Sequence, residues 1–202
     1  AGMLSKNIDL RERRPLIEKI SESLKMRGPD GFGDITKPYV SLIHRRLSVI
    51  DPERGAQPMV FGKYTIVYNG EIYNTDEIRQ ELISAGYSFD THCDTEVILK
   101  AYHCWKEESC KKLNGIFAYA VWDDETKELF LCRDRIGVKP LYFTYKDGIF
   151  VFASRIKSLL LIPEVSADVD ENGLNEIFML GPAKTIGTAV FKDIQELPPA
   201  AY

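Results

Sequence analysis

Membrane-spanning segments are absent from this sequence, because no apolar run approaches the ~20 residues that cross a bilayer. A signal-peptide pattern is also absent from the first residues. No long basic run is present, and the net charge is −4, which argues against a nucleic-acid-binding surface. Internal repeats and low-complexity tracts are missing too. These absences predict a globular protein with no membrane and no nucleic acid as a partner.

Cysteine is scarce, and the spacing of the cysteines matches no zinc signature, so no metal site is predicted. Cys93 lies between His92 and Asp94, which looks like a Cys-His-Asp cluster. Neighbouring residues on a chain rarely face one another, so a catalytic role for this cluster is not favoured. Reduced thiols predict a cytoplasmic protein. The four cysteines are Cys93, Cys104, Cys110 and Cys132.

The chain has 202 residues, of which 45% are hydrophobic and 28% are charged. This length suits one large domain or one and a half. Two strand-rich zones, each followed by helices, predict an α+β protein with two packed antiparallel sheets and helices outside them. Strands are predicted at 1–4, 39–50, 64–68, 116–122, 129–132, 141–145 and 149–152, and helices at 14–26, 75–85, from 94, 156–161 and 171–180.

The central stretch of the chain is 64–74, read as Y-T-I-V-Y-N-G-E-I-Y-N. It begins as an alternating strand, and Asn69-Gly70 is a turn signal because both residues tolerate positive φ. Thr75 is the predicted cap of the following helix. The strand would deliver an amide, a bare backbone N–H and the carboxylate of Glu71 to one sheet end, as a site for an oxyanion and an amino acid requires. An ordinary strand-to-helix turn is the alternative.

Two arginines, Arg45 and Arg46, interrupt an apolar run. On a half-buried strand one of them must point toward the core side, where a guanidinium needs a carboxylate partner. An internal ion pair and a clamp for a substrate carboxylate both remain open. Asp94 begins a helix, where it can serve as the N-cap, as a ligand or as both. The loop 27–31, R-G-P-D-G, is either an ordinary connecting loop or a rigid loop that carries an arginine near the site.

Eight segments in order and spacing resemble the class II glutamine amidotransferase domain of glutamine-hydrolysing asparagine synthetases, and the match covers nearly the whole chain. Each motif alone is weak, but the combination of N-G-E-I-Y-N with R-D-R-x-G-x-K-P-L-Y points to this family. The segments are R-G-P-D-G at 27–31, H-R-R-L-S-V-I-D at 44–51, Q-P-M at 57–59, Y-N-G-E-I-Y-N at 68–74, D-T-E-V-I-L at 94–99, N-G-I-F-A-Y-A-V-W-D at 114–123, R-D-R-I-G-V-K-P-L-Y at 133–142 and F-A-S-R-I-K-S-L at 152–159.

The resemblance implies an N-terminal-nucleophile hydrolase fold, a four-layer αββα sandwich. It implies hydrolysis of L-glutamine to glutamate and ammonia, which passes to a synthetase domain that uses ATP and magnesium. No cofactor is expected in the present domain. Residues 1–162 would form the amidotransferase domain, and 163–202 an extension toward that synthetase domain. A homodimer is compatible with this assignment.

The resemblance also assigns site residues, and each assignment agrees with the chemistry of the side chain. Arg46 would bind the α-carboxylate of glutamine, and the backbone of Leu47, Ser48, Val49 and Ile50 would line the same pocket. Asn69, through its amide, and Gly70, through its N–H, would form the oxyanion hole. Glu71 and Asp94 would hold the α-ammonium group.

Three departures from the family pattern stand out. The family nucleophile is a cysteine at the first position, whose α-amine, with a pKa near 8, acts as the base. Here Ala1-Gly2 aligns with the Ala-Gly that follows Cys-Gly-Ile, so we expect the leading residues to be absent from this sequence; a cysteine-to-alanine change at Ala1 is the alternative. Arg155 replaces a glutamate, and the pyrophosphate loop of the synthetase half is missing, so this chain should not bind ATP. A non-catalytic binding module is the second hypothesis.

Overall fold

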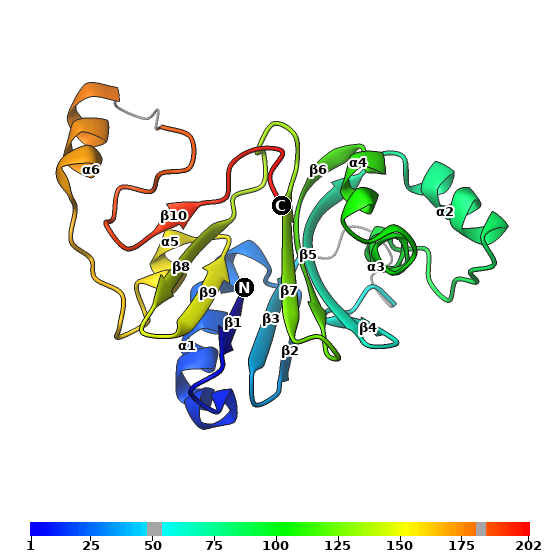
Figure 1. The fold of residues 1–202 in the computed structure, drawn as a ribbon, viewed down its shortest axis with the longest axis horizontal. Helices are drawn as coiled ribbons and strands as arrows, with labels where there is room; N and C mark the ends of the chain where they lie inside the picture. Colours follow the sequence, from blue (N-terminus) through cyan, green and yellow to red (C-terminus); the bar gives the residue numbers. More distant parts are fainter. Residues whose placement is uncertain (48–53, 181–184) are drawn as a thin grey trace.

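The computed structural model describes residues 1–47, 54–180 and 185–202. Two antiparallel sheets pack face to face, and helices cover both outer faces (Figure 1). One sheet has six strands in the order β10-β8-β9-β1-β3-β2, and the other has four in the order β4-β5-β6-β7. The predicted α+β fold, an αββα sandwich, is confirmed.

The elements have the following bounds. The strands are β1 (Gly2–Ser5), β2 (Gly31–Thr36), β3 (Val40–Arg46), β4 (Met59–Phe61), β5 (Tyr64–Ile72), β6 (Gly115–Asp123), β7 (Glu128–Arg133), β8 (Tyr142–Lys146), β9 (Ile149–Ala153) and β10 (Gln195–Glu196). The α-helices are α1 (Arg14–Ser23), α2 (Thr75–Ser84), α3 (Asp94–Trp105), α4 (Ser109–Lys112), α5 (Ile156–Leu159) and α6 (Glu171–Asn175). Short 3-10 helices are Leu10–Arg13, Lys25–Arg27 and Lys106–Glu108, and a π-helix, Glu176–Leu180, continues α6.

Alternation along the strands divides the buried side chains into three layers. Between the sheets, Val67 and Ala118 of the four-stranded sheet share a core with Leu42 and Phe152 of the six-stranded sheet. The outer face of the four-stranded sheet packs against α2 and α3 through Ile66, Tyr119, Leu82 and Ile98. The outer face of the six-stranded sheet packs against α1 and α5 through Met3, Ile43, Ile17 and Leu159.

Several element boundaries differ from the predictions. The first helix is α-helical only through Ser23 and tightens into a 3-10 turn at Lys25–Arg27, before the loop rich in helix breakers. Thr75 is not the cap of α2: Asn74 is the N-cap residue, and the Thr75 hydroxyl donates to the Ile72 carbonyl at 2.6 Å. The predicted helix at 171–180 is divided between α6 and the π-helix.

Three strands were not predicted. β2 has the sequence G-F-G-D-I-T, which has no apolar alternation. β4 is only three residues long, and β10, in the predicted extension 163–202, pairs with β8 at the edge of the six-stranded sheet. The boundary at residue 162 stays a prediction.

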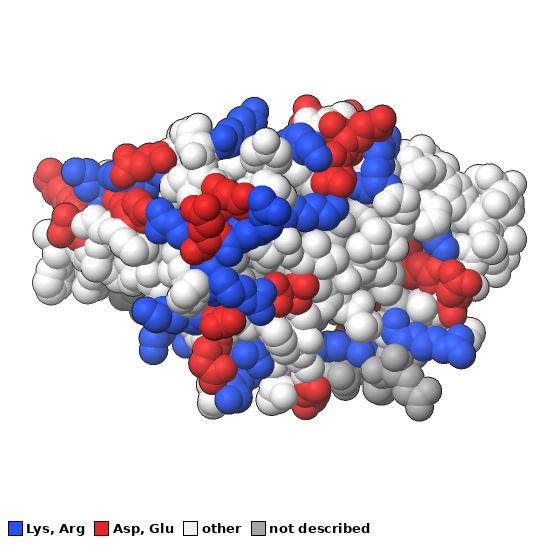
Figure 2. Space-filling model, turned by 90° about the horizontal axis from the view of Figure 1, so that it is seen from below, with Lys and Arg blue, Asp and Glu red and all other residues white. Residues whose placement is uncertain are grey.

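Charged side chains are interspersed on the face shown in Figure 2, where basic and acidic groups alternate around a broad uncharged area. That face therefore offers no wide surface of one sign. Fifteen ion pairs join described residues, and most of their side chains are partly exposed, a setting in which each pair contributes little stability.

Packing of α2 on the four-stranded sheet gives a stability prediction. Leu82 is fully buried, whereas the adjacent Ile83 is 46% exposed. Leu82→Ala should lower the free energy of unfolding by about 2–5 kcal/mol, because it removes buried methyl groups and leaves a cavity. Ile83→Ala is the matched control and should change it by less than about 1 kcal/mol. Urea unfolding of both variants measures the difference, and equal losses would contradict this packing.

Candidate functional site

A cavity of about 280 Å³ opens where β3 and β5 end, beside the start of α3. Strand alternation explains why polar side chains converge on it. Asn69 and Glu71 share a face of β5 with Val67, and Arg46 shares a face of β3 with Leu42; Val67 and Leu42 both belong to the core between the sheets. Both strands therefore direct their last polar side chains toward the space between the two sheets.

The two arginines of β3 point to opposite faces of the strand. Arg45 reaches α1, where its Nε donates to Ser21 Oγ at 2.9 Å and its guanidinium pairs with Glu22 at 3.1 Å. Arg46, on the other face, lines the cavity, whose wall also includes part of Arg45. The sequence leaves an internal ion pair and a substrate clamp open; Arg45 forms the ion pair, and Arg46 lies where a clamp would have to be.

The turn predicted at Asn69–Gly70 is wrong, because β5 continues to Ile72. Asn69 pairs opposite Ala118 of β6, and Gly70 opposite Phe117, so the strand ladder overrides the local turn signal. The glycine is required for a different reason. A Cβ on Gly70 would lie 2.3 Å from the Ile116 carbonyl oxygen, which no side chain could tolerate.

The backbone N–H of Gly70 points away from β6. Phe117 is the residue paired with Gly70 across β5 and β6. Its N–H donates to the Asp134 carboxylate at 3.2 Å, and its C=O accepts from the Asp134 N–H at 2.8 Å. Gly70 and Phe117 are therefore a non-hydrogen-bonded pair, so the Gly70 N–H faces the other edge of β5. On that same edge, the Tyr68 N–H donates to Gln57 Oε1 at 2.6 Å. The Gly70 N–H thus faces the cavity, where the Asn69 side chain also lies.

Asp94 is 5% exposed and lies at the cavity wall. It is not the N-cap of α3, which is Cys93; Asp94 is the first helical residue, and its carboxylate accepts a hydrogen bond from the Tyr68 hydroxyl at 2.6 Å. Burial raises the pKa of the Asp94 carboxyl above its usual range, although the Tyr68 hydroxyl and the Ile72 N–H oppose that shift. A cation bound beside it would favour the ionised form.

A second cavity of about 70 Å³ adjoins the first and is lined by Ala1, with His44, Tyr68 and Asn69 shared between the two. The Ala1 amine donates to the Ile43 carbonyl at 2.9 Å, and burial lowers the pKa of this amine to about 5. Burial also lowers the pKa of His44 to about 4, and the positive charge of the nearby amine acts in the same direction. His44 is neutral at pH 7, and its Nε2–H donates to the Tyr68 carbonyl at 3.0 Å, because a carbonyl can only accept.

The structure brings most of the predicted site residues together. Arg46, Leu47, Asn69, Gly70, Glu71 and Asp94 all line the larger cavity, while Ser48, Val49 and Ile50 lie outside the described residues. Residue-level reasoning missed His44, Gln57 and Lys139, which also line it. Each of the three belongs to a segment that carries the family resemblance, so the signal was present without an assigned role.

Cys93 lines the cavity but does not form a catalytic cluster with its neighbours. It is 2% exposed, its Sγ lies 2.9 Å from Thr91 Oγ1, and Asp94 is directed to Tyr68 instead. Within residues 1–47, 54–180 and 185–202, no group of three or more His, Cys, Asp or Glu side chains could hold a metal ion. No helix in the same ranges is both long and apolar enough to cross a bilayer.

Comparison with solved structures identifies the fold. The chain is similar to the glutamine phosphoribosylpyrophosphate amidotransferase of Bacillus subtilis complexed with ADP and GMP, with a TM-score of 0.67 and 20% identity over 79% of this chain and 42% of that one. A second structure, described as the allosteric regulatory enzyme of purine biosynthesis, gives a TM-score of 0.66 at 19% identity. This protein therefore shares their fold, and the N-terminal-nucleophile hydrolase fold expected from the sequence is confirmed.

Sequence comparison identifies the family. The family described as glutamine amidotransferase domain matches residues 1–202, so this chain belongs to it. Asparagine synthetase [glutamine-hydrolyzing] 3 of Bacillus subtilis is 45% identical over 94% of this chain, and asparagine synthetase [glutamine-hydrolyzing] 1 of the same organism is 40% identical over 82%. The chain spans 31% and 26% of these relatives, so it corresponds to less than a third of their length.

The buried His44 predicts a specific dependence of stability on pH. Its pKa is 6.5 when exposed and about 4 in the fold, so between these values the unfolded chain binds more protons. The free energy of unfolding should therefore fall as the pH drops from 6.5 to 4, by up to about 3 kcal/mol from this residue. His44→Gln should flatten that part of the stability profile measured by urea unfolding. His92→Gln, at an exposed histidine, is the control and should keep the slope. An unchanged slope in His44→Gln would refute this assignment.

Proposed function

We propose that this chain is the glutaminase domain of a glutamine-hydrolysing asparagine synthetase. The observation that carries the proposal is the arrangement of one cavity, in which a guanidinium, two oxyanion donors and two carboxylates meet next to the start of β1. An α-amino acid with a side-chain amide matches this set, because it presents a carboxylate, an ammonium group and a carbonyl that becomes an oxyanion.

Each group has a role that follows from its charge. Arg46 binds the α-carboxylate through a charge-assisted pair of hydrogen bonds. Glu71 and Asp94 accept from the α-ammonium group, which also offsets the effect of burial on the Asp94 carboxyl. The Asn69 amide and the Gly70 N–H stabilise negative charge on the oxygen of the side-chain amide. Leu47 lines the same pocket.

The register of β1 supports a nucleophile supplied by the Cys-Gly-Ile pattern of the family. β1 pairs with β3 so that Gly2 lies opposite Leu42, and Ala1 exchanges both backbone hydrogen bonds with Ile43. Three further residues in the same register would lie opposite His44, Arg45 and Arg46. A cysteine in the third place would face Arg46, with its side chain on the face of β1 that looks between the sheets.

The reaction then follows from these positions. The α-amine of that cysteine accepts the thiol proton, and the thiolate attacks the side-chain amide carbon of glutamine. The oxyanion held by Asn69 and Gly70 collapses, the amine returns the proton to the leaving nitrogen, and ammonia departs. Water then cleaves the thioester to glutamate and regenerates the thiol. The relatives are about three times as long as this chain, and we place the acceptor of the ammonia in a synthetase domain of the parent protein.

Glutamate release from L-glutamine tests the proposal. The chain with Cys-Gly-Ile placed ahead of Ala1 should hydrolyse glutamine, and the same chain with Ser in place of that cysteine is the control. A folded protein with a free N-terminal cysteine that releases no glutamate would contradict the proposal. That result would favour a binding module, which titration with L-glutamine would then identify.

Substitutions of the carboxylate-binding residue and of the oxyanion donor should affect different kinetic constants, KM and kcat respectively. Arg46→Ala should raise the KM for glutamine by about 10- to 100-fold, since it removes a charged hydrogen-bonding partner of the ground state. Asn69→Ala should instead lower kcat by about 10²–10³-fold, because it removes an oxyanion donor. Arg13→Ala, which removes an ion pair with Glu164 and lines neither cavity, is the control and should leave KM within about twofold. Equal effects of Arg46→Ala and Asn69→Ala on both constants would refute these roles.

A further inference from the structure

The loop 134–140 forms one wall of the two adjoining cavities. Lys139 lines the larger cavity together with Arg46, Asn69 and Gly70, and Pro140 lines the smaller one together with Ala1. No ion pair found among the described residues includes Lys139. Its ammonium group therefore stands at the wall of the cavity with no carboxylate partner in the described part of the chain.

The Asp134 carboxylate fixes the shape of this loop. It is fully buried and accepts from the backbone N–H groups of Ile136, Val138 and Lys139 at 3.2, 3.0 and 3.0 Å. It also accepts from the N–H of Phe117, the residue opposite Gly70. One carboxylate thus ties the position of Lys139 to the strand pair that presents the Gly70 N–H. Burial alone would raise the pKa of Asp134, but these backbone donors hold it below its usual range.

Arg133 ties the same loop to the C-terminal tail 195–201. Its guanidinium donates to the carbonyls of Lys139 and Gly137, both at 2.7 Å, and to that of Leu197 at 2.5 Å. It pairs with Glu196 at 3.0 Å, and the two side chains are 5% and 6% exposed. A buried ion pair of this kind is costly to break, because the remaining charge is left without a partner.

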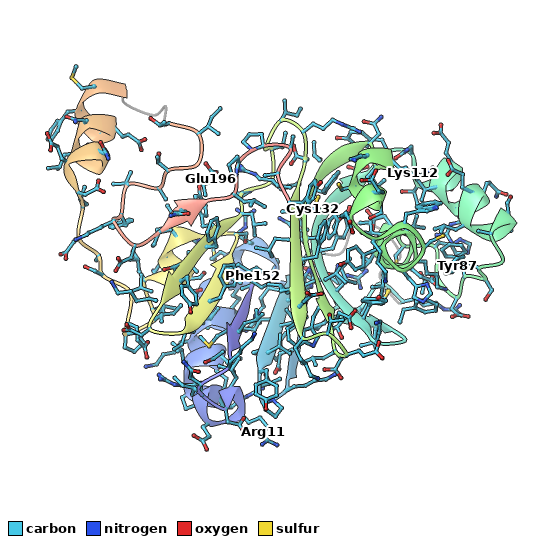
Figure 3. All side chains as sticks on the ribbon, viewed as in Figure 1. Arg11, Tyr87, Lys112, Cys132, Phe152 and Glu196 are labelled. Carbon is cyan, nitrogen blue, oxygen red and sulfur yellow. The ribbon has the colours of Figure 1, made fainter. Side chains whose placement is uncertain are left out.

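Backbone hydrogen bonds hold the rest of the tail against the loop. Leu197 N–H donates to Leu141, and Ala200 N–H to Asp134, at 2.8 and 3.0 Å; Arg133 N–H donates to Ala201 at 3.1 Å. Figure 1 shows the tail, in red, running from β10 to the end of β7, and Figure 3 labels Glu196 on it and Cys132 near the end of β7. The tail is therefore bonded to the first residue of the loop and to the residues that flank the loop on both sides, Arg133 and Leu141.

We propose that Lys139 is a further glutamine-binding residue and that the buried Arg133–Glu196 pair is the device that positions it. This inference rests on the proposed function, because it names a new contact of the same site. Lys139 adds an ammonium group to the arginines that line the cavity, and it binds the α-carboxylate of the substrate. The tail 195–201 then belongs to the glutamine site although none of its residues lines the cavity.

Steady-state hydrolysis of L-glutamine by the chain with Cys-Gly-Ile placed ahead of Ala1 tests the first part. Lys139→Met should raise KM about tenfold, the loss of one charge-assisted contact, with kcat within about twofold. Lys139→Arg should recover most of the affinity, because it keeps the charge. An unchanged KM in Lys139→Met would overturn the role of Lys139.

A double-mutant cycle tests the positioning role of Glu196. Glu196→Gln should raise KM about three- to tenfold without lowering kcat, and combining it with Lys139→Met should raise KM no further than Lys139→Met alone. Asp193→Asn is the matched control, because Asp193 lies two residues before the tail and pairs with Lys146 of β8 at 3.2 Å. It should leave KM unchanged at a comparable loss of thermal stability. Multiplicative effects of Glu196→Gln and Lys139→Met, or equal effects of Asp193→Asn and Glu196→Gln, would overturn the proposal.

The unsubstituted protein separates failure of this inference from failure of the proposed function. Hydrolysis by that protein with no change in the variants contradicts only the inference. If the protein binds L-glutamine in calorimetry but does not hydrolyse it, hydrolysis is refuted, and the same variants are compared through Kd in place of KM. If it binds no glutamine at all, both proposals fail together.

Discussion

The site depends on the face-to-face packing of two sheets whose strands end at the same place. Ala118 and Ala120 of β6 are small, so the inner faces approach closely and share one core with Leu42 and Phe152. Side chains alternate strictly along a strand. Once Leu42 and Val67 occupy that core, Arg46 and Asn69 must emerge between the sheets at its open end. The convergence of a cation with the oxyanion donors is therefore a consequence of register rather than of any loop.

This position also sets the electrostatics. Groups at the end of a packed core are poorly hydrated, which disfavours their charged forms unless a partner is present. His44 consequently stays neutral and bridges the sheets by donating to Tyr68, while the Asp94 carboxyl has a raised pKa. A zwitterionic substrate would supply the counter-charges that the protein itself leaves incomplete. In such a site, ligand binding and the ionisation of the site are coupled.

The sequence predicted the hairpins β6–β7 and β8–β9 and the general arrangement of layers, because alternation and turn residues are local signals. Asn69–Gly70 shows where local signals fail: the dipeptide favours a turn, yet pairing with Ala118 and Phe117 keeps it extended. β2 has no apolar alternation that would predict a strand. It is held in place by its pairing with β3 rather than by burial of its side chains. The two-residue β10 exists only because β8 offers an edge. Such elements are determined by tertiary contacts, which no window of sequence contains.

The types of residue at the site were predictable from motif resemblance, but the sequence did not show which of them are structural and which face the substrate pocket. Arg45 and Arg46 are neighbours with the same chemistry and both contribute to the cavity wall, but they lie on opposite faces of β3, and only Arg45 pairs with Glu22 of α1. Arg133 and Leu197 are 64 residues apart, and their contact fixes a loop that reaches the cavity. Segments far apart in the sequence thus shape the site: Ala1 lines the smaller cavity, and the tail acts through the loop that Arg133 holds. The tail reaches the two cavities through the 134–140 loop and through Leu141, so a change in how the tail is held acts on the site through Lys139, Pro140 and Leu141.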